Sequence, residues 1–247
     1  MLTIAEFKLP SLTNGSKERY LRYAMQVLEA QQQMTTKKGK NILHYTLEKK
    51  RRHVRMNHYP KGDRIDHDTG AQYFYHCHRE DLASNEHGHF HCFLRYKHIP
   101  KQIKPTDLPD WDKNIDNPMT HLVAIAMNRF GQPIRLFTVN RWISYEIWYD
   151  AKHISRFIKQ FKMTLADPYW KILDQWVEGM LHLFSPQIAW LHQARDAAVA
   201  RHKTLFPTEN AYEDKQIEEW SAITIDLNQQ IQWLLTTETA PKNEIVI

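Results

Sequence analysis

Residues 72–95 read QYFYHCHREDLASNEHGHFHCFLR, two runs of aromatic and histidine residues on either side of a polar stretch. Aromatic and β-branched residues favour strands, and a polar stretch between two such runs is typical of a connecting loop. We therefore expect residues 72–95 to form an antiparallel β-hairpin. Alternate side chains of a strand point to the same face of the sheet, so each run should place two histidines on one face.

This alternation predicts a metal site. If residues 79–88 close the hairpin with His78 opposite His89, then His76 lies opposite His91, and the four imidazoles share one face. Opposed residues of an antiparallel pair have Cβ atoms about 4.5–5.5 Å apart, which allows imidazole nitrogens to meet around one ion. We predict a transition-metal site with these four histidines as ligands.

Three neighbouring side chains are secondary ligand candidates: Glu86, His87 and His121. Imidazole ligands without thiolates suit Zn(II), Fe(II), Cu(II) or Ni(II), and the ligand set does not choose among them. The alternative is a ladder of neutral, hydrogen-bonded histidines that holds no ion. Cys77 and Cys92 alternate with the histidines, so we expect them on the opposite face as small buried residues.

Outside the hairpin, the sequence predicts an α+β fold: an antiparallel sheet of about four strands, with an N-terminal helix and a C-terminal group of helices packed on it. The runs HLVAIAM (121–127) and IRLFTVNRWI (134–143) supply the other two strands. Apolar residues at helical spacing indicate a helix over 17–34, with Ser16 as its N-cap, and several helices after Ile147. The last of these begins at Asp226.

The organisation that follows is a sheet region with its N-terminal helix over residues 1–150 and a helical region over 151–247. We expect both to belong to one globular domain, because 42% hydrophobic residues among 247 suffice for a sizeable core. No window approaches the roughly 18 consecutive apolar residues of a membrane span, and only two cysteines are present. These features favour a cytoplasmic protein without a membrane partner.

Basic residues are concentrated between residues 37 and 55, where eight lysines and arginines accompany a single acid, Glu48. Such a patch can bind nucleic acid, although a solvated basic face is the simpler interpretation. The chain has no glycine-rich phosphate loop, so nucleotide-binding folds of that kind are disfavoured. An anionic small molecule is a second candidate partner.

Three polar residues near the ends of predicted strands are candidates for binding such an anion: Arg95, Asn140 and Arg141. Arg95 shares the parity of the histidines along its strand, so it should lie on their face of the sheet. Asn140 and Arg141 follow a strand, where polar groups often face a pocket. The alternative for this pair is an asparagine-mediated turn and surface solvation.

The triplet His89-Phe90-His91 resembles the His-hydrophobic-His motif of rolling-circle replication and relaxase nucleases, and ILHYTL (42–47) could stand in for their first strand. The resemblance implies a divalent metal that polarises a scissile phosphate. It also implies Tyr149 as a nucleophile, with Lys152 nearby, and single-stranded DNA held by residues 37–55.

A broader resemblance covers residues 57–225. It is carried by HYPKGD (58–63), GAQYFYHCHRE (70–80), EHGHFHCFLR (86–95), HLVAIAM (121–127), GQPIRLFTVNRW (131–142) and LFSPQI (183–188). These segments are similar to those of an uncharacterised bacterial protein family. The resemblance implies a bacterial cytoplasmic protein and a common domain, and it carries over no catalytic roles.

Two functional hypotheses follow from the histidines. In the first, the protein is a metal-dependent enzyme whose pocket lies between the histidine face and Asn140-Arg141, with an open coordination position that activates water or dioxygen. In the second, the ion is structural or sensed and the site is closed. The sequence leaves the reaction, the substrate and the oligomeric state undecided.

Overall fold

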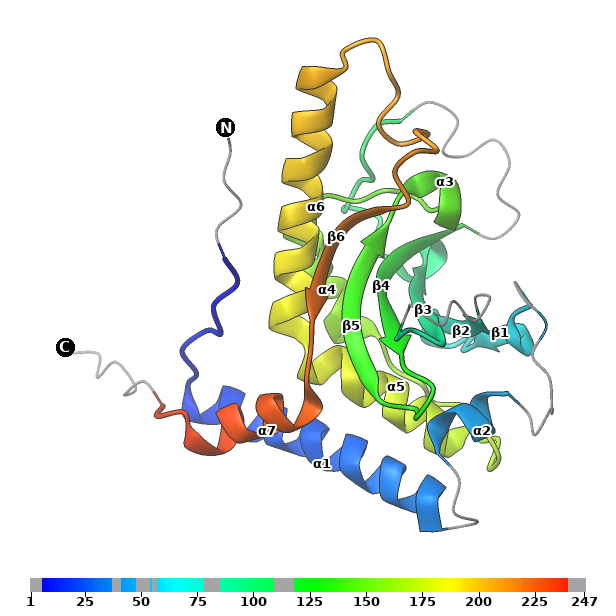
Figure 1. The fold of residues 1–247 in the computed structure, drawn as a ribbon, viewed down its shortest axis with the longest axis vertical. Coiled ribbons are helices and arrows are strands. Elements are labelled where there is room, and N and C mark those ends of the chain that lie inside the picture. The colour runs from blue at the N-terminus through cyan, green and yellow to red at the C-terminus, as the bar shows by residue number, and fades with distance from the viewer. Residues whose placement is uncertain are drawn as a thin grey trace.

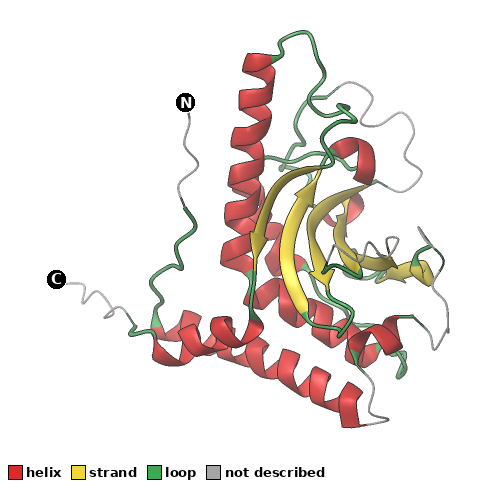
Figure 2. Ribbon diagram, in the orientation of Figure 1, coloured by secondary structure: helices red, strands yellow, loops and turns green. Residues whose placement is uncertain are grey.

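A computed structural model describes residues 6–36, 41–47, 54, 57–77, 85–108 and 118–239 (Figure 1). Its centre is a six-stranded antiparallel sheet whose spatial order follows the chain, β1-β2-β3-β4-β5-β6 (Figure 2). The strands are β1 Tyr59–Ile65, β2 Ala71–Cys77, β3 Gly88–Arg95, β4 Met119–Met127, β5 Pro133–Val139 and β6 Glu219–Thr224.

Helices pack against one face and one end of the sheet (Figure 1). The long helix α6 lies along β5 and β6, α4 packs on α6, and α1 packs on α5. The helices are α1 Asn14–Thr36, α2 Ile42–Thr46, α3 Arg141–Ser144, α4 Ala151–Gln160, α5 Lys171–Leu183, α6 Ser185–Leu205 and α7 Leu227–Thr236, with a short 3₁₀ turn η1 at Tyr96–His98. None of these helices is both long enough and apolar enough to span a membrane.

The predicted α+β class is confirmed, but the sheet has six strands where we expected about four. Strand β1, YPKGDRI, contains Pro60 and Gly62, which are signals of a turn. It tolerates them because it is an edge strand with an irregular register between Tyr59 and Arg64. The opposite edge strand, β6, lies far from β5 in the sequence. It is half-exposed, so its sequence shows little of the apolar alternation that would predict a strand.

Helix boundaries follow local capping. Helix α1 begins at Asn14, and the Thr13 hydroxyl accepts a hydrogen bond from the Ser16 amide, so the prediction of Ser16 as N-cap was wrong. Asp226 does cap α7, with Oδ1 accepting from the Gln229 amide at 2.9 Å. Residues 42–46 form a helix, which contradicts the comparison of ILHYTL with a nuclease strand.

The hairpin of β2 and β3 has a different register from the one predicted. His76 lies opposite His89, and Phe74 lies opposite His91. The prediction was wrong by two residues, an error that alternation cannot detect because it repeats every two residues and leaves each side chain on its face. His78 lies outside the described residues.

Gly88 lies at the loop end of the pair, where it faces Cys77. A Cβ atom on Gly88 would lie 2.3 Å from the His76 carbonyl oxygen and 2.8 Å from the Tyr75 hydroxyl. Only glycine leaves room for the two strands to approach at this point.

The two faces of the sheet differ in chemistry. Tyr73, Tyr75 and Phe90 belong to the main hydrophobic core, where Trp176 of α5 packs on Phe90. Cys77 and Cys92 are free thiols buried in the same core, as expected from their alternation with the histidines. The other face carries the histidines, and it is described below.

Replacing Gly88 tests the close approach. We expect Gly88→Ala to lower the free energy of unfolding by about 1–3 kcal/mol, because the added Cβ forces the strands apart. Gly15→Ala is the control, since a Cβ at Gly15 in α1 meets nothing within 4 Å. Urea denaturation of both variants measures the difference, and equal stability would show that β3 tolerates a side chain at position 88.

Candidate metal centre

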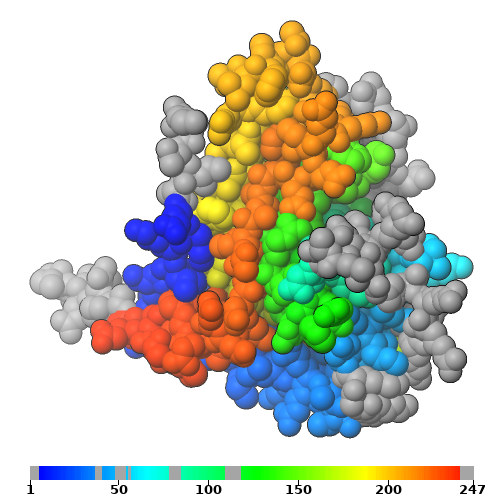
Figure 3. Space-filling view, in the orientation of Figure 1, coloured from blue at the N-terminus to red at the C-terminus, as the bar shows by residue number. Residues whose placement is uncertain are grey.

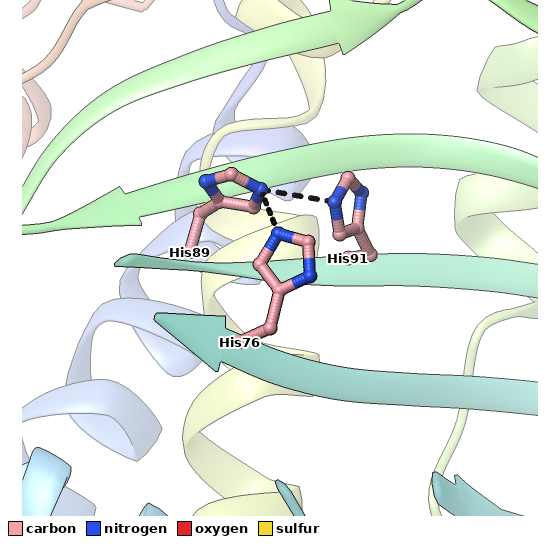
Figure 4. Close-up of side chains that lie close together, drawn as sticks. All are labelled: His76, His89 and His91. Carbon is pink, nitrogen blue, oxygen red and sulfur yellow. Dashed lines mark hydrogen bonds between the residues drawn. The ribbon is translucent and has the colours of Figure 1, made fainter. Parts of the chain in front are cut away.

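Three histidines converge on the face of the sheet opposite the helices (Figure 4). His76 comes from β2, and His89 and His91 come from β3. The Nε2 atom of His89 lies 2.7 Å from Nε2 of His76 and 3.0 Å from Nε2 of His91. The three residues are 6%, 6% and 3% exposed, so the cluster is buried. The sequence analysis grouped all three correctly on one face.

The protonation pattern makes this cluster unusual. Nδ1 of His89 lies 2.7 Å from Oε1 of Glu86, which places the His89 proton on Nδ1. Nε2 of His89 then offers a single lone pair, toward which both other rings direct their own Nε2 atoms. One lone pair makes one good hydrogen bond, so it does not satisfy both neighbouring Nε2 atoms at once. A cation at this point would satisfy a lone pair from each of the three rings.

The spacing is also close to that of a metal complex. Nitrogens bound to one tetrahedral zinc ion at about 2.0–2.1 Å lie roughly 3.3 Å apart. The observed 2.7 and 3.0 Å separations need to widen by only a few tenths of an ångström. One ligand atom from each histidine lies within 4.8 Å of the others. Small rotations of the rings would therefore admit an ion.

Glu86 orients His89 from behind. Its other carboxylate oxygen accepts from Arg135 of β5 at 2.9 Å, and Arg135 in turn pairs with Glu219 of β6. Burial alone would raise the pKa of Glu86, but the bonds from His89 and Arg135 prevail and lower it. The carboxylate is therefore ionised and holds His89 with Nε2 directed at the cluster, the arrangement that commonly supports a metal-bound histidine.

His121 of β4 has the same place behind His91, with its Nε2 3.0 Å from Nδ1 of His91. Burial, reinforced by the nearby charge of Arg195, lowers the pKa of His121 to about 3. Burial also holds the pKa of His91 well below its usual value. Both rings are neutral at neutral pH, so His91 can offer Nε2 as a ligand while Nδ1–H donates to His121.

Glu146 is a buried support that the sequence analysis did not identify. Its carboxylate accepts from the His121 amide at 2.9 Å and from the hydroxyls of Thr120 and Ser144. Burial raises its pKa to about 7. The available signal was a lone acid in the aromatic run WISYEIWY (142–149), because an acid in such a run must be either exposed or hydrogen-bonded.

Two other predicted ligands, His87 and His121, do not join the three histidines. Nδ1 of His87 lies 2.7 Å from the hydroxyl oxygen of Tyr75. The Tyr75 ring belongs to the main core on the helix side of the sheet. His121 contacts His91 only through the outer nitrogen of that ring, so it orients a ligand and is not itself at the centre.

The candidate anion-binding residues are separated in the structure. Asn140 caps the short helix α3 and donates to two backbone carbonyls, Ala211 and Asp214, as in the turn interpretation. Arg141 pairs with Glu213. Arg95 lies on the histidine face, as its parity predicted, at the far end of β3 from His89.

The residues required by the nuclease resemblance also lie elsewhere. Tyr149 is 0% exposed, belongs to the main hydrophobic core and packs on Phe157 of α4. Lys152 is exposed and pairs with Asp150. Of the basic segment 37–55, only residues 41–47 and 54 fall within the described part of the chain.

A family model described as a domain of unknown function (DUF6969) matches residues 21–225. This agrees with the resemblance to an uncharacterised family. Neither the curated proteins nor the solved structures include a match to this chain.

The buried histidines predict an acid-sensitive fold. When a histidine is neutral in the folded protein but binds a proton in the unfolded chain, the protein becomes less stable as the pH falls below about 6.5. Its free energy of unfolding then decreases by about 1.4 kcal/mol per pH unit. For the chelator-treated protein, we expect His121→Gln to show a shallower loss of unfolding free energy than the wild type between pH 6.5 and 5. Urea denaturation at both pH values measures it, and equal slopes would contradict a neutral His121.

Proposed function

The chain belongs to the DUF6969 family, a domain of unknown function, and from this premise we propose that it binds one transition-metal ion through His76, His89 and His91. The observation that carries the proposal is the convergence of three buried Nε2 atoms on one point. Outer contacts from Glu86 and His121 support two of the rings in the tautomers that a ligand needs.

Burial favours the metal-bound state. Metal and proton compete for the same imidazole nitrogen, and burial lowers the pKa of His91 well below its usual value. This ring is consequently free of its second proton at neutral pH. Three imidazole ligands suit Zn(II), Fe(II), Cu(II) and Ni(II), so the metal is a question for elemental analysis.

The set of three histidine donors found among the described residues favours a site with an exchangeable position. Catalytic zinc sites use three protein ligands and leave the fourth position to water or substrate, whereas structural sites use four protein ligands. His121 is bonded to the back of His91 and is therefore a support for a ligand. We accordingly propose a metal-dependent enzyme in which the ion activates a bound molecule, and the competing hypothesis is a closed structural or sensing site.

Metal analysis tests the binding itself. Protein purified without a metal-binding tag should hold about one metal equivalent, and the double variant His89→Ala/His91→Ala should hold none, because two of the three ligands are gone. His182→Ala is the matched control, since it removes another buried histidine, one that bonds the Phe161 carbonyl on the helix side. Equal metal content in the wild type and the double variant would exclude the site.

The same measurement on His78→Ala separates the two kinds of site. His78 is the fourth ligand of the original sequence prediction and lies outside the described residues. An open site keeps its metal in this variant, and a closed four-histidine site loses most of its affinity.

Glu86→Gln tests the orienting role of the carboxylate. We expect metal affinity to fall about 10–100-fold, because the amide no longer fixes the His89 tautomer with a charge. Glu219→Gln, which alters the far side of Arg135 and leaves the bond from Glu86 to His89 in place, should change affinity much less. Titration with a competing chelator gives both values, and equal affinities in the two variants would remove Glu86 from the site.

A further inference from the structure

Arg95 is a buried cation on the histidine face of the sheet. It is 6% exposed and lies four residues beyond His91 on the same strand, about 13 Å along β3. Its Nη1 atom donates to Oε1 of Gln72 at 2.8 Å. Its Nε atom is enclosed and has no hydrogen-bond partner.

No carboxylate contacts this guanidinium within the described residues. Other arginines with largely buried side chains do have one; the pairs are Arg64 with Asp174, Arg135 with Glu86, Arg141 with Glu213 and Arg195 with Asp196. Burial lowers the pKa of Arg95, and the opposing influence is Asp63, which reaches Arg95 only through Gln72. A buried charge without a contacting counter-ion destabilises a fold, so Arg95 calls for a functional explanation.

The free edge of the guanidinium has the geometry of an anion receptor. Gln72 occupies Nη1, which leaves Nε and Nη2, the two parallel donors that bind a carboxylate or phosphate group in a bidentate manner. Gln72 is itself fixed, because its amide donates to Oδ2 of Asp63 at 2.8 Å. The donors are thus held in place before a ligand arrives.

The side chains between Arg95 and the three histidines are aromatic and buried. Phe93 lies between His91 and Arg95 on β3, and it stacks on Phe74 with ring centroids 5.7 Å apart. Phe74 also contacts His91 at 5.2 Å. Buried aromatic rings therefore line the path along β3 from the guanidinium to the metal centre.

We propose that Arg95 binds the oxyanion group, carboxylate or phosphate, of an organic ligand whose other end reaches the metal. The ligand class is a bifunctional organic anion with an apolar middle. The inference rests on the proposed metal site for the position of the second end, but the anion site at Arg95 can be tested alone.

The test is to titrate the chelator-treated full chain with inorganic phosphate and, separately, with acetate. Calorimetry measures the binding, and the change in melting temperature provides a second measure of it. The wild type should bind at least one of the two saturably and gain thermal stability from it, and which of them binds distinguishes phosphate from carboxylate. Arg95→Gln should bind at least tenfold more weakly. Arg141→Gln, whose guanidinium is already paired with Glu213, should bind like the wild type.

Stability without added anion provides a second readout. Arg95→Gln should melt at the same temperature as the wild type or above it, because an unpaired buried charge has been removed. A merely structural arginine would give a lower melting temperature. Should Arg95→Gln fail to fold, Arg95→Lys keeps the charge without the paired donors and should also bind at least tenfold more weakly.

The outcomes for the two sites are separable. Absence of saturable binding by the wild type, or equal binding by Arg95→Gln, overturns the anion site. Binding that requires added metal and disappears in His89→Ala/His91→Ala, but persists in Arg95→Gln, places the anion on the ion and also overturns it. Anion binding that depends on Arg95, in a protein whose untreated form holds no metal in the elemental analysis, supports the anion site, while that analysis overturns the metal proposal.

Discussion

The antiparallel pairing of β2 and β3 is the constraint on which the rest of the structure depends. Alternation along these two strands sends tyrosines, Phe90 and both cysteines into the helix-covered core, and sends the histidines to the other face. The helices then need only bury one apolar surface. The polar face is left to carry chemistry, and its rings meet because the register places His76 directly opposite His89.

Much of this could be predicted from the sequence, because alternation is a local property. The shared face of the histidines, the burial of the cysteines and the parity of Arg95 all follow from counting residues along one strand. The register could not be predicted in this way, since a slip of two residues leaves every side chain on its face. The supports Glu86, Glu146 and Gln72 depend on contacts between different strands and loops, and the sequence named only the first of them.

Electrostatics separates the roles within the histidine face. Glu86 remains ionised despite burial, because His89 and Arg135 donate to it, and it can fix the tautomer of the His89 ring. His91 and His121 stay neutral because burial disfavours their charged forms. His91, a neutral ring supported by His121, and His89, a ring oriented by Glu86, are suited to ligate a cation. The one guanidinium of this face without a contacting carboxylate, among the described residues, is suited to bind an anion.

Strand β6 connects this face to a distant part of the chain. It lies at the sheet edge beside β5, and the segment from β6 to α7, orange to red in the space-filling view, crosses the surface of the molecule (Figure 3). Glu219 of β6 accepts a hydrogen bond from Arg135, and Arg135 also donates to Glu86. Glu86 in turn is hydrogen-bonded to His89. During translation the ribosome must therefore release residues well beyond the hairpin before this chain of contacts is complete. The sheet that carries the histidines therefore gains its last strand only late in synthesis, after residues 219–224 have emerged.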